Sequence, residues 1–390
     1  MPTPRIPEWR KLPVTLSELC IDTTLRCGQA FRWQKINDEW NCVLHGRLLS
    51  LKQDDKFLHY KVTWPKGHRK APKKEDDTEA LLRHYFSLET DLAALYSKWA
   101  ESDPNFREKA PKFTGIRILN QDAWETLIAF ICSSNNNISR ISSMVEKLCI
   151  HYGPFIGRVG DVAFYDFPSP EALTTHKTDS HLRKLGFGYR ASYIALTATM
   201  VSMLKPEGWL QSLMNPENPG WGVTPTPAPE NEITYKKAHE QLLTLSGVGP
   251  KVADCVCLMG LGWAEAVPVD THVWQIAQRD YNFGKSKTKT FTKSMYDAVG
   301  DHFRKIWGPQ AGWAQSVLFT ANLKSFSEQA AGKLEPAPVV AEIKQETDVE
   351  ASVSKTRKRR RTSVVQETKV EEVSTPDIKT ANKRRKRTRG

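Results

Sequence analysis

The sequence predicts an α+β fold in which an N-terminal antiparallel β-sheet domain packs on a mostly helical body, followed by a disordered basic C-terminal tail. Three observations lead to this prediction. Apolar and polar residues alternate between residues 9 and 64, helical periodicity dominates from Thr78 onward, and residues 330–390 lack aromatic side chains and apolar periodicity. A chain of 390 residues with 39% hydrophobic residues has the length of two or three domains. We expect them at 1–110, 111–329 and 330–390.

Short strands and a tight turn make up the N-terminal segment. Residues 40–44 and 47–51 are apolar-rich runs on either side of a His45-Gly46 turn, and residues 57–64 alternate between apolar and polar side chains. Such runs joined by two turn residues are typical of antiparallel hairpins. Residues 66–77 are polar and basic, which predicts a loop.

Helical periods follow this loop. Residues 80–86 and 92–99 place apolar side chains at helical spacing. Two long loops are expected to interrupt the helices, because residues 205–230 are rich in proline and glycine and residues 282–294 are rich in lysine.

A helix-hairpin-helix over residues 238–260 is the most informative local motif. An apolar-periodic helix end at residues 238–245 leads to Gly247 and Gly249, and Pro250 opens a second helix. The glycines are expected to take unusual backbone angles and to let another backbone approach closely. Because N–H groups at a helix N-terminus bind phosphate, the hairpin predicts contact with DNA. Many non-enzymatic DNA-binding modules carry the same motif.

Lys251 and Asp270 are the candidate catalytic pair. Lys251 directly follows the hairpin, and Asp270 comes later, in a Pro-Val-Asp turn. An amine and a carboxylate across one cleft can attack a sugar C1′ covalently and stabilise the cation that develops there. Each residue also has a structural interpretation: Lys251 as a phosphate contact or solvated helix residue, and Asp270 as the N-cap of a helix that begins at Thr271. Together, the two residues favour catalysis.

Cysteine usage and hydropathy exclude several classes of protein. The seven cysteines are scattered and odd in number, as expected of reduced thiols, and no cysteine cluster follows Asp270 to hold an iron–sulfur centre. We predict no metal and no cofactor, because an amine can itself be the covalent catalyst. No apolar run reaches the length of a transmembrane helix, and the Pro-rich residues 1–7 are unlike a secretory signal, so we expect no membrane partner.

Positive charge is concentrated in the tail. Residues 331–390 hold 16 Lys and Arg against 9 Asp and Glu, so they supply +7 of the formal net charge of +12. The body is therefore mildly basic, and DNA binding there has to depend on placed groups. The clusters 355–361 and 383–387 favour a nuclear import receptor as partner, with a non-specific DNA arm as the alternative. We expect nuclear localisation, and a mitochondrial pool is compatible with the sequence.

Seven blocks of the sequence, in order, carry a resemblance to a known family. They are Gly28–Trp33, Cys132–Ile138, Leu185–Arg190, Gly247–Cys255, Ala266–His272, Trp307–Pro309 and Ala311–Gln315. These blocks resemble eukaryotic 8-oxoguanine DNA glycosylase, a family of the helix-hairpin-helix glycosylase superfamily. The resemblance covers about residues 10 to 325 and implies that the helical body is a glycosylase domain.

The resemblance implies a bifunctional DNA glycosylase and AP lyase of base excision repair. The enzyme would act as a monomer on double-stranded DNA that contains 8-oxoguanine opposite cytosine, and would flip the damaged base out of the duplex. Lys251 would attack C1′ to form a Schiff base that undergoes β-elimination, and Asp270 would orient the attack. Other implied roles are Cys255 and Phe319 on the two faces of the flipped base, Gln315 on its Watson–Crick edge, the Gly28 carbonyl at its N7 hydrogen, Asn135, Arg140 and Arg190 on the orphaned cytosine, Tyr189 as a wedge, and Gly247, Gly249 and His272 at the DNA backbone.

Structural interpretations of these residues stay open. Phe319 and Cys255 are compatible with core packing. Residues 135–137 are compatible with a helix break and the cap of the next helix, and Arg190 with a phosphate contact alone.

Asn322 departs from the family, where an acidic residue is expected, so the support of Gln315 or His272 is expected to differ. Two alternative functions also remain. One is a glycosylase of the same superfamily for another lesion. Lys251 argues against the alkyl-base type, and the missing cysteine cluster argues against the pyrimidine type. The other is a non-catalytic DNA-binding module, in which Lys251 and Asp270 are only a phosphate contact and a cap.

Overall fold

The computed structural model describes residues 8–65, 76–224, 233–284 and 292–326. The predicted tail, with its two basic clusters, lies outside the described residues. So do most of the predicted loop 66–77 and parts of the loops 205–230 and 282–294. None of the described helices combines the length and the hydropathy needed to cross a membrane.

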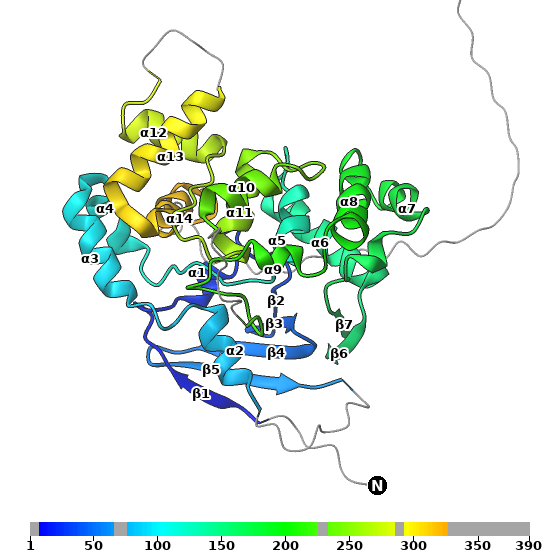
Figure 1. Cartoon of the computed structure of the whole chain (residues 1–390). Helices are drawn as coiled ribbons and strands as arrows, with labels where there is room; N and C mark the ends of the chain where they lie inside the picture. The colour runs from blue at the N-terminus through cyan, green and yellow to red at the C-terminus, as the bar shows by residue number, and fades with distance from the viewer. Residues whose placement is uncertain (1–7, 66–75, 225–232, 285–291, 327–390) are drawn as a thin grey trace, which may run out of the picture. The chain divides into compact units, whose positions relative to one another are not determined.

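The predicted antiparallel sheet is confirmed. Five strands pair in the order β1-β5-β4-β3-β2, and all pairings are antiparallel (Figure 1). His45 and Gly46 form the predicted turn, and both have positive φ angles, 47° and 73°, as a type I′ turn requires. The strands are β1 Arg10–Pro13, β2 Gln34–Ile36, β3 Glu39–Leu44, β4 Arg47–Gln53 and β5 Phe57–Thr63.

Helices dominate from Thr78 onward, as predicted. They are α2 Thr78–Tyr85, α3 Leu92–Ser102, α4 Pro104–Lys109, α5 Ala123–Ile131, α6 Ile138–Tyr152, α7 Thr178–Lys184, α8 Arg190–Thr199, α9 Trp209–Ser212, α10 Tyr235–Leu242, α11 Pro250–Gly260, α12 Thr271–Asp280, α13 Lys293–Trp307 and α14 Ala311–Asn322; the short α1, Ile21–Thr24, precedes them. The expectation of a continuous loop at 205–230 is wrong over α9, because Trp209 and Leu210 are buried and packing orders that turn. A hairpin of β6 Phe155–Val159 and β7 Val162–Tyr165 was not predicted.

The two faces of the sheet bury different residues, as the two-residue period of a strand requires. On one face, Leu49 and Leu51 join a hydrophobic cluster with residues of α1 and α2. On the other, Val43 and Leu48 pack with Ile156 of the β6–β7 hairpin. The sheet is thus covered on both faces.

The limits predicted between the domains, at 110/111 and 329/330, stay predictions.

Helices α5 and α11 pack closely in the helical body (Figure 1). All of α5 except Glu125 is buried, and so is α11 from Val252 to its end. Gly260 permits this packing, because a Cβ atom there would lie 3.0 Å from the Ala123 Cα atom. The contact fixes the start of α11 relative to the end of α5.

Candidate active site

The predicted hairpin connects α10 to α11, and only one of its two glycines has an unusual conformation. Gly247 has φ +76°, and a Cβ atom there would lie 2.6 Å from the Tyr193 ring. The expectation for Gly249 is wrong in its backbone angles: φ −99° and ψ 178° are extended values that any residue adopts. Gly249 is exposed, and a Cβ atom there would meet nothing within 4 Å, so space for another backbone is retained.

Lys251 is half-buried in the first turn of α11, where two residues of the α5 segment contact its amine. The Nζ atom lies 3.3 Å from the Ser133 Oγ atom and 4.6 Å from the centre of the Phe130 ring. A hydroxyl and an aromatic face can hold an amine in one place. Sequence reasoning missed both residues, because nothing in the local pattern of α5 indicates which helix packs on it.

Asp270 is the N-cap of α12, so its structural interpretation is confirmed. Its Oδ1 atom accepts hydrogen bonds from the backbone N–H groups of His272 and Val273, both at 2.9 Å. Both cap bonds use Oδ1, which leaves Oδ2 outside the cap. The carboxylate can therefore cap α12 through Oδ1 and still interact with another group through Oδ2.

One cavity brings the predicted base-binding and catalytic residues together. Its volume of about 50 Å³ holds a few water molecules but not a purine base, so side chains have to move before a base can enter. Its lining includes six predicted site residues: Gly28, Lys251, Cys255, Asp270, Gln315 and Phe319.

Gly28 has a conformation that requires glycine. Its φ is +90°, and a Cβ atom would lie 3.1 Å from the Ile138 Cδ1 atom. The neighbouring Gln29 is held on both sides of its side chain: its amide donates to the Arg117 carbonyl at 2.8 Å and accepts from the Leu119 N–H at 3.0 Å. These bonds fix the backbone that carries the Gly28 carbonyl, a support that the sequence did not predict.

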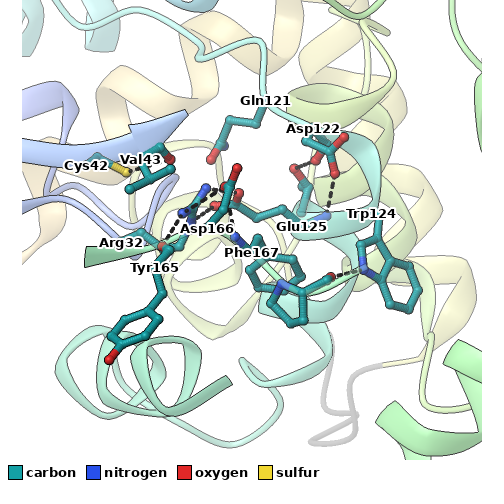
Figure 2. A network of polar contacts seen from close by, with 12 residues as sticks. Arg32, Cys42, Val43, Gln121, Asp122, Trp124, Glu125, Tyr165, Asp166 and Phe167 are labelled. Carbon is teal, nitrogen blue, oxygen red and sulfur yellow. Dashed lines mark hydrogen bonds and ion pairs between the residues drawn. The ribbon is translucent and has the colours of Figure 1, made fainter. Parts of the chain in front are cut away.

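An ion-pair cluster anchors the same segment to α5. The Arg32 guanidinium donates to Glu125 at 2.9 and 2.6 Å and lies 3.5 Å from Asp166 (Figure 2). All three side chains are largely buried, so loss of one partner would leave an uncompensated charge. A larger cavity, about 670 Å³, is lined by this cluster, and neither Lys251 nor Asp270 lines it.

The walls of the small cavity differ in character. Burial raises the pKa of the Cys255 thiol to about 11, and the nearby Lys251 ammonium group partly opposes this shift. The thiol is therefore neutral near pH 7. The Phe319 ring is half-buried and contacts the His272 ring edge-on, with ring centres 5.8 Å apart.

Asn322, the residue that departs from the family pattern, accepts a hydrogen bond from Arg279 at 3.0 Å.

The residues predicted to read the opposite base form a separate cluster. Asn137 caps α6, and Asn136 donates to the Cys132 carbonyl at the end of α5, which confirms the helix break and cap. Asn135 lies in the loop between α5 and α6, where it is exposed and has φ +48°. Tyr189 donates to the Ser134 carbonyl at 3.1 Å.

Arg190 holds the backbone of this cluster through hydrogen bonds. It is buried, and it donates to the Asn135 carbonyl at 3.2 Å and to the Ser134 carbonyl. In the free protein its role is therefore to hold the loop that presents Asn135. Arg140 is exposed on the first turn of α6, which directly follows the same loop.

Known proteins match the chain over most of its length. Residues 11–127 match the 8-oxoguanine DNA glycosylase N-terminal domain, and residues 128–298 match the HhH-GPD superfamily of base excision DNA repair proteins. The N-glycosylase/DNA lyase of Saccharomyces cerevisiae is 39% identical over 339 residues, 80% of this chain and 86% of the relative. The N-glycosylase/DNA lyase OGG1 of Arabidopsis thaliana is 36% identical over 354 residues, 87% and 89% of the two chains.

Solved structures agree with this assignment. MBOgg1 in complex with a low affinity DNA ligand is 26% identical, with a TM-score of 0.63, and the match covers 81% of this chain and 98% of that chain. The fold is also shared with the 8-oxoguanine glycosylase/lyase of Clostridium acetobutylicum, which is 22% identical with a TM-score of 0.64 over 84% and 98% of the two chains. The chain therefore belongs to the eukaryotic 8-oxoguanine DNA glycosylase family, and it is a DNA N-glycosylase and DNA lyase of base excision repair.

Proposed function

We propose that the enzyme excises 8-oxoguanine opposite cytosine and then cleaves the strand through a Schiff base on Lys251. The observation that carries this proposal is the shared cavity of Lys251 and Asp270, which also contains Gly28, Cys255, Gln315 and Phe319. A DNA-binding module would need neither an amine nor a carboxylate in a pocket for one base.

The covalent step begins at the Lys251 amine. Nζ attacks C1′, the bond from C1′ to N9 of the base breaks, and the base leaves with the bonding electrons. Opening of the sugar ring at O4′ converts the adduct into an imine. Loss of a C2′ proton then expels the 3′ phosphate, which is the lyase step. The contacts of Nζ with Ser133 and Phe130 support the proposal, because they hold the amine at the cavity wall.

Asp270 supplies a negative charge opposite to the positive charge that develops on the sugar. Positive charge develops on the sugar as the base departs, and a fixed carboxylate stabilises that charge without having to reorganise. Its N-cap bonds fix Oδ1 and leave Oδ2 for the sugar or the amine.

Recognition of the damaged base rests on a single backbone group. Guanine carries an acceptor at N7, whereas 8-oxoguanine carries a donor there, so a carbonyl attracts one and repels the other. The glycine-only conformation at Gly28 and the bonds of Gln29 support this role. An unmatched buried polar group costs roughly 1–3 kcal/mol, which is enough to bias excision.

The cytosine that loses its partner when the damaged base flips out would be recognised by a separate group of residues, at the loop that presents Asn135. Asn135 is exposed at the loop that Arg190 and Tyr189 hold through backbone carbonyls, and an Asn side chain can both donate and accept. We also propose that the enzyme acts as a monomer and is imported into the nucleus through the basic clusters 355–361 and 383–387.

Borohydride trapping on a labelled duplex with 8-oxoguanine opposite cytosine tests the proposal. Wild type and the control Lys236→Gln, an exposed lysine on α10, should give a covalent adduct. Lys251→Gln should give none while still binding the lesion. An adduct with Lys251→Gln would overturn the assignment of the nucleophile. Equal excision opposite adenine would overturn the preference for cytosine.

A further inference from the structure

We propose that Tyr296 and Asp254 form a buried positioning pair that holds Asp270 in place for the reaction. Neither side chain lines the cavity that contains Lys251. The inference rests on the proposed function of Asp270 and adds the residues through which that function is maintained.

Asp254 is a carboxylate buried in α11, one turn after Lys251. It is 1% exposed, and two tyrosines donate to it: Tyr235 to Oδ1 and Tyr296 to Oδ2, both at 2.5 Å. His239 lies 3.4 Å from Oδ1. Burial raises the pKa of the Asp254 carboxyl group, and the two hydroxyl groups oppose that shift.

The hydroxyl group of Tyr296 connects this carboxylate to the next catalytic segment. While it donates to Asp254, it also accepts a hydrogen bond from the Val269 backbone N–H at 3.3 Å. Val269 is the residue immediately before Asp270. The path therefore runs from α11, which carries Lys251, through Tyr296 of α13 to the turn that presents Asp270.

Tyr235 makes the same kind of bond to the same carboxylate, but among the described residues no backbone group next to Asp270 bonds to its hydroxyl group. Its hydroxyl group donates to Asp254, and its ring lies beneath the Arg304 guanidinium, 5.6 Å away. It thus provides a matched comparison. Loss of either hydroxyl removes one hydrogen bond from a buried carboxylate, but only the loss of the Tyr296 hydroxyl releases the backbone before Asp270.

Single-turnover excision with the full-length variants Tyr296→Phe and Tyr235→Phe tests the inference, with thermal unfolding and lesion binding measured in parallel. Tyr296→Phe should lower the rate constant about tenfold, because small displacements of a catalytic group are costly. Its affinity for the lesion duplex should stay within about twofold of wild type. Tyr235→Phe should lose a similar amount of stability and keep its rate within about twofold.

A double-mutant cycle separates positioning from general destabilisation. If Tyr296 acts through Asp270, then Tyr296→Phe should cause no further loss in an Asp270→Asn background. Asp254→Asn replaces one of the two acceptor oxygens by an amide donor, so it should behave in the same way and serves if Tyr296→Phe does not fold. Equal rate losses in the two tyrosine variants, or additive losses in the cycle, would overturn the inference. Failure of the proposed function would instead appear as unchanged activity of Asp270→Asn alone.

Discussion

Lys251 and Asp270 lie at the N-terminal ends of two successive helices and contribute to the wall of one cavity. Lys251 is in the first turn of α11, and Asp270 is the N-cap of α12. Helix N-termini carry partial positive charge, which interacts favourably with a carboxylate such as that of Asp270. The same geometry that makes Asp270 a cap thus also suits the chemistry proposed for the pair.

The two roles of Asp270 can be separated by substitution. Asp270→Asn keeps an oxygen that can cap α12, so its thermal stability should stay close to that of wild type. Asp270→Ala should lose about 1 kcal/mol of unfolding free energy, because the cap is gone. Single-turnover assays should show that both variants lose excision by a similar factor. If Asp270→Asn excises at the wild-type rate, the residue is only a cap.

Gly28→Ala should damage recognition of the lesion more than it damages the fold. The positive φ costs about 1 kcal/mol for alanine, and the new methyl group would press on Ile138 at 3.1 Å. Gly160→Ala is the matched control, because Gly160 also has positive φ, 56°, with nothing within 4 Å. Both variants should unfold a few degrees below wild type in a thermal melt, but only Gly28→Ala should lose discrimination between 8-oxoguanine and guanine. Equal discrimination by the two variants would contradict the role of the Gly28 carbonyl.

Ser133→Ala should slow adduct formation without weakening DNA binding. The Ser133 hydroxyl is 3.3 Å from Nζ of Lys251, and the loss of one such bond corresponds to a factor of roughly two to ten in rate. Ser143→Ala, an exposed position on α6, is the control. The measurement is the rate of borohydride-trapped product under single turnover. An unchanged rate for Ser133→Ala would show that the amine is held by other groups.

Cys255 should not contribute a titration to the reaction near neutral pH. Burial raises the pKa of its thiol to about 11, so the thiol stays protonated as pH rises from 6 to 9. Cys255→Ala should weaken excision through lost contact with the base, yet its pH–rate profile over about pH 6 to 9 should have the shape of the wild-type profile. A profile that loses one ionisation below pH 9 in the variant would show a thiolate in the working enzyme.

The sheet could be predicted because its signals are local. Alternation along the strands and the His45-Gly46 turn depend only on neighbours in sequence. The β6–β7 hairpin was missed because Phe155 and Val162 are exposed, so the apolar pattern of residues 155–165 does not mark a buried face. The short helix α9 was missed because its order comes from burial of Trp209 rather than from its own sequence.

The predicted catalytic and base-binding residues belong to recognisable sequence blocks, and the cavity brings them together. The residues predicted to read the opposite base lie outside that cavity. Phe130, Ser133 and Tyr296 could not be predicted, because their positions follow from the packing of α5 on α11 and of α13 beside them. For Gly249, by contrast, the sequence predicted an unusual backbone conformation that the structure does not have. A glycine in a motif does not itself imply a positive φ, and what Gly249 contributes here is open space beside the backbone.

Mass-spectrometric mapping of the reduced adduct tests the central claim most directly. The wild-type enzyme is trapped with borohydride on the 8-oxoguanine duplex opposite cytosine, digested, and searched for the peptide that carries the sugar remnant. We expect the modification on Lys251 alone. A remnant on any other lysine, or on the N-terminal amine, would contradict the assignment of Lys251 as the nucleophile.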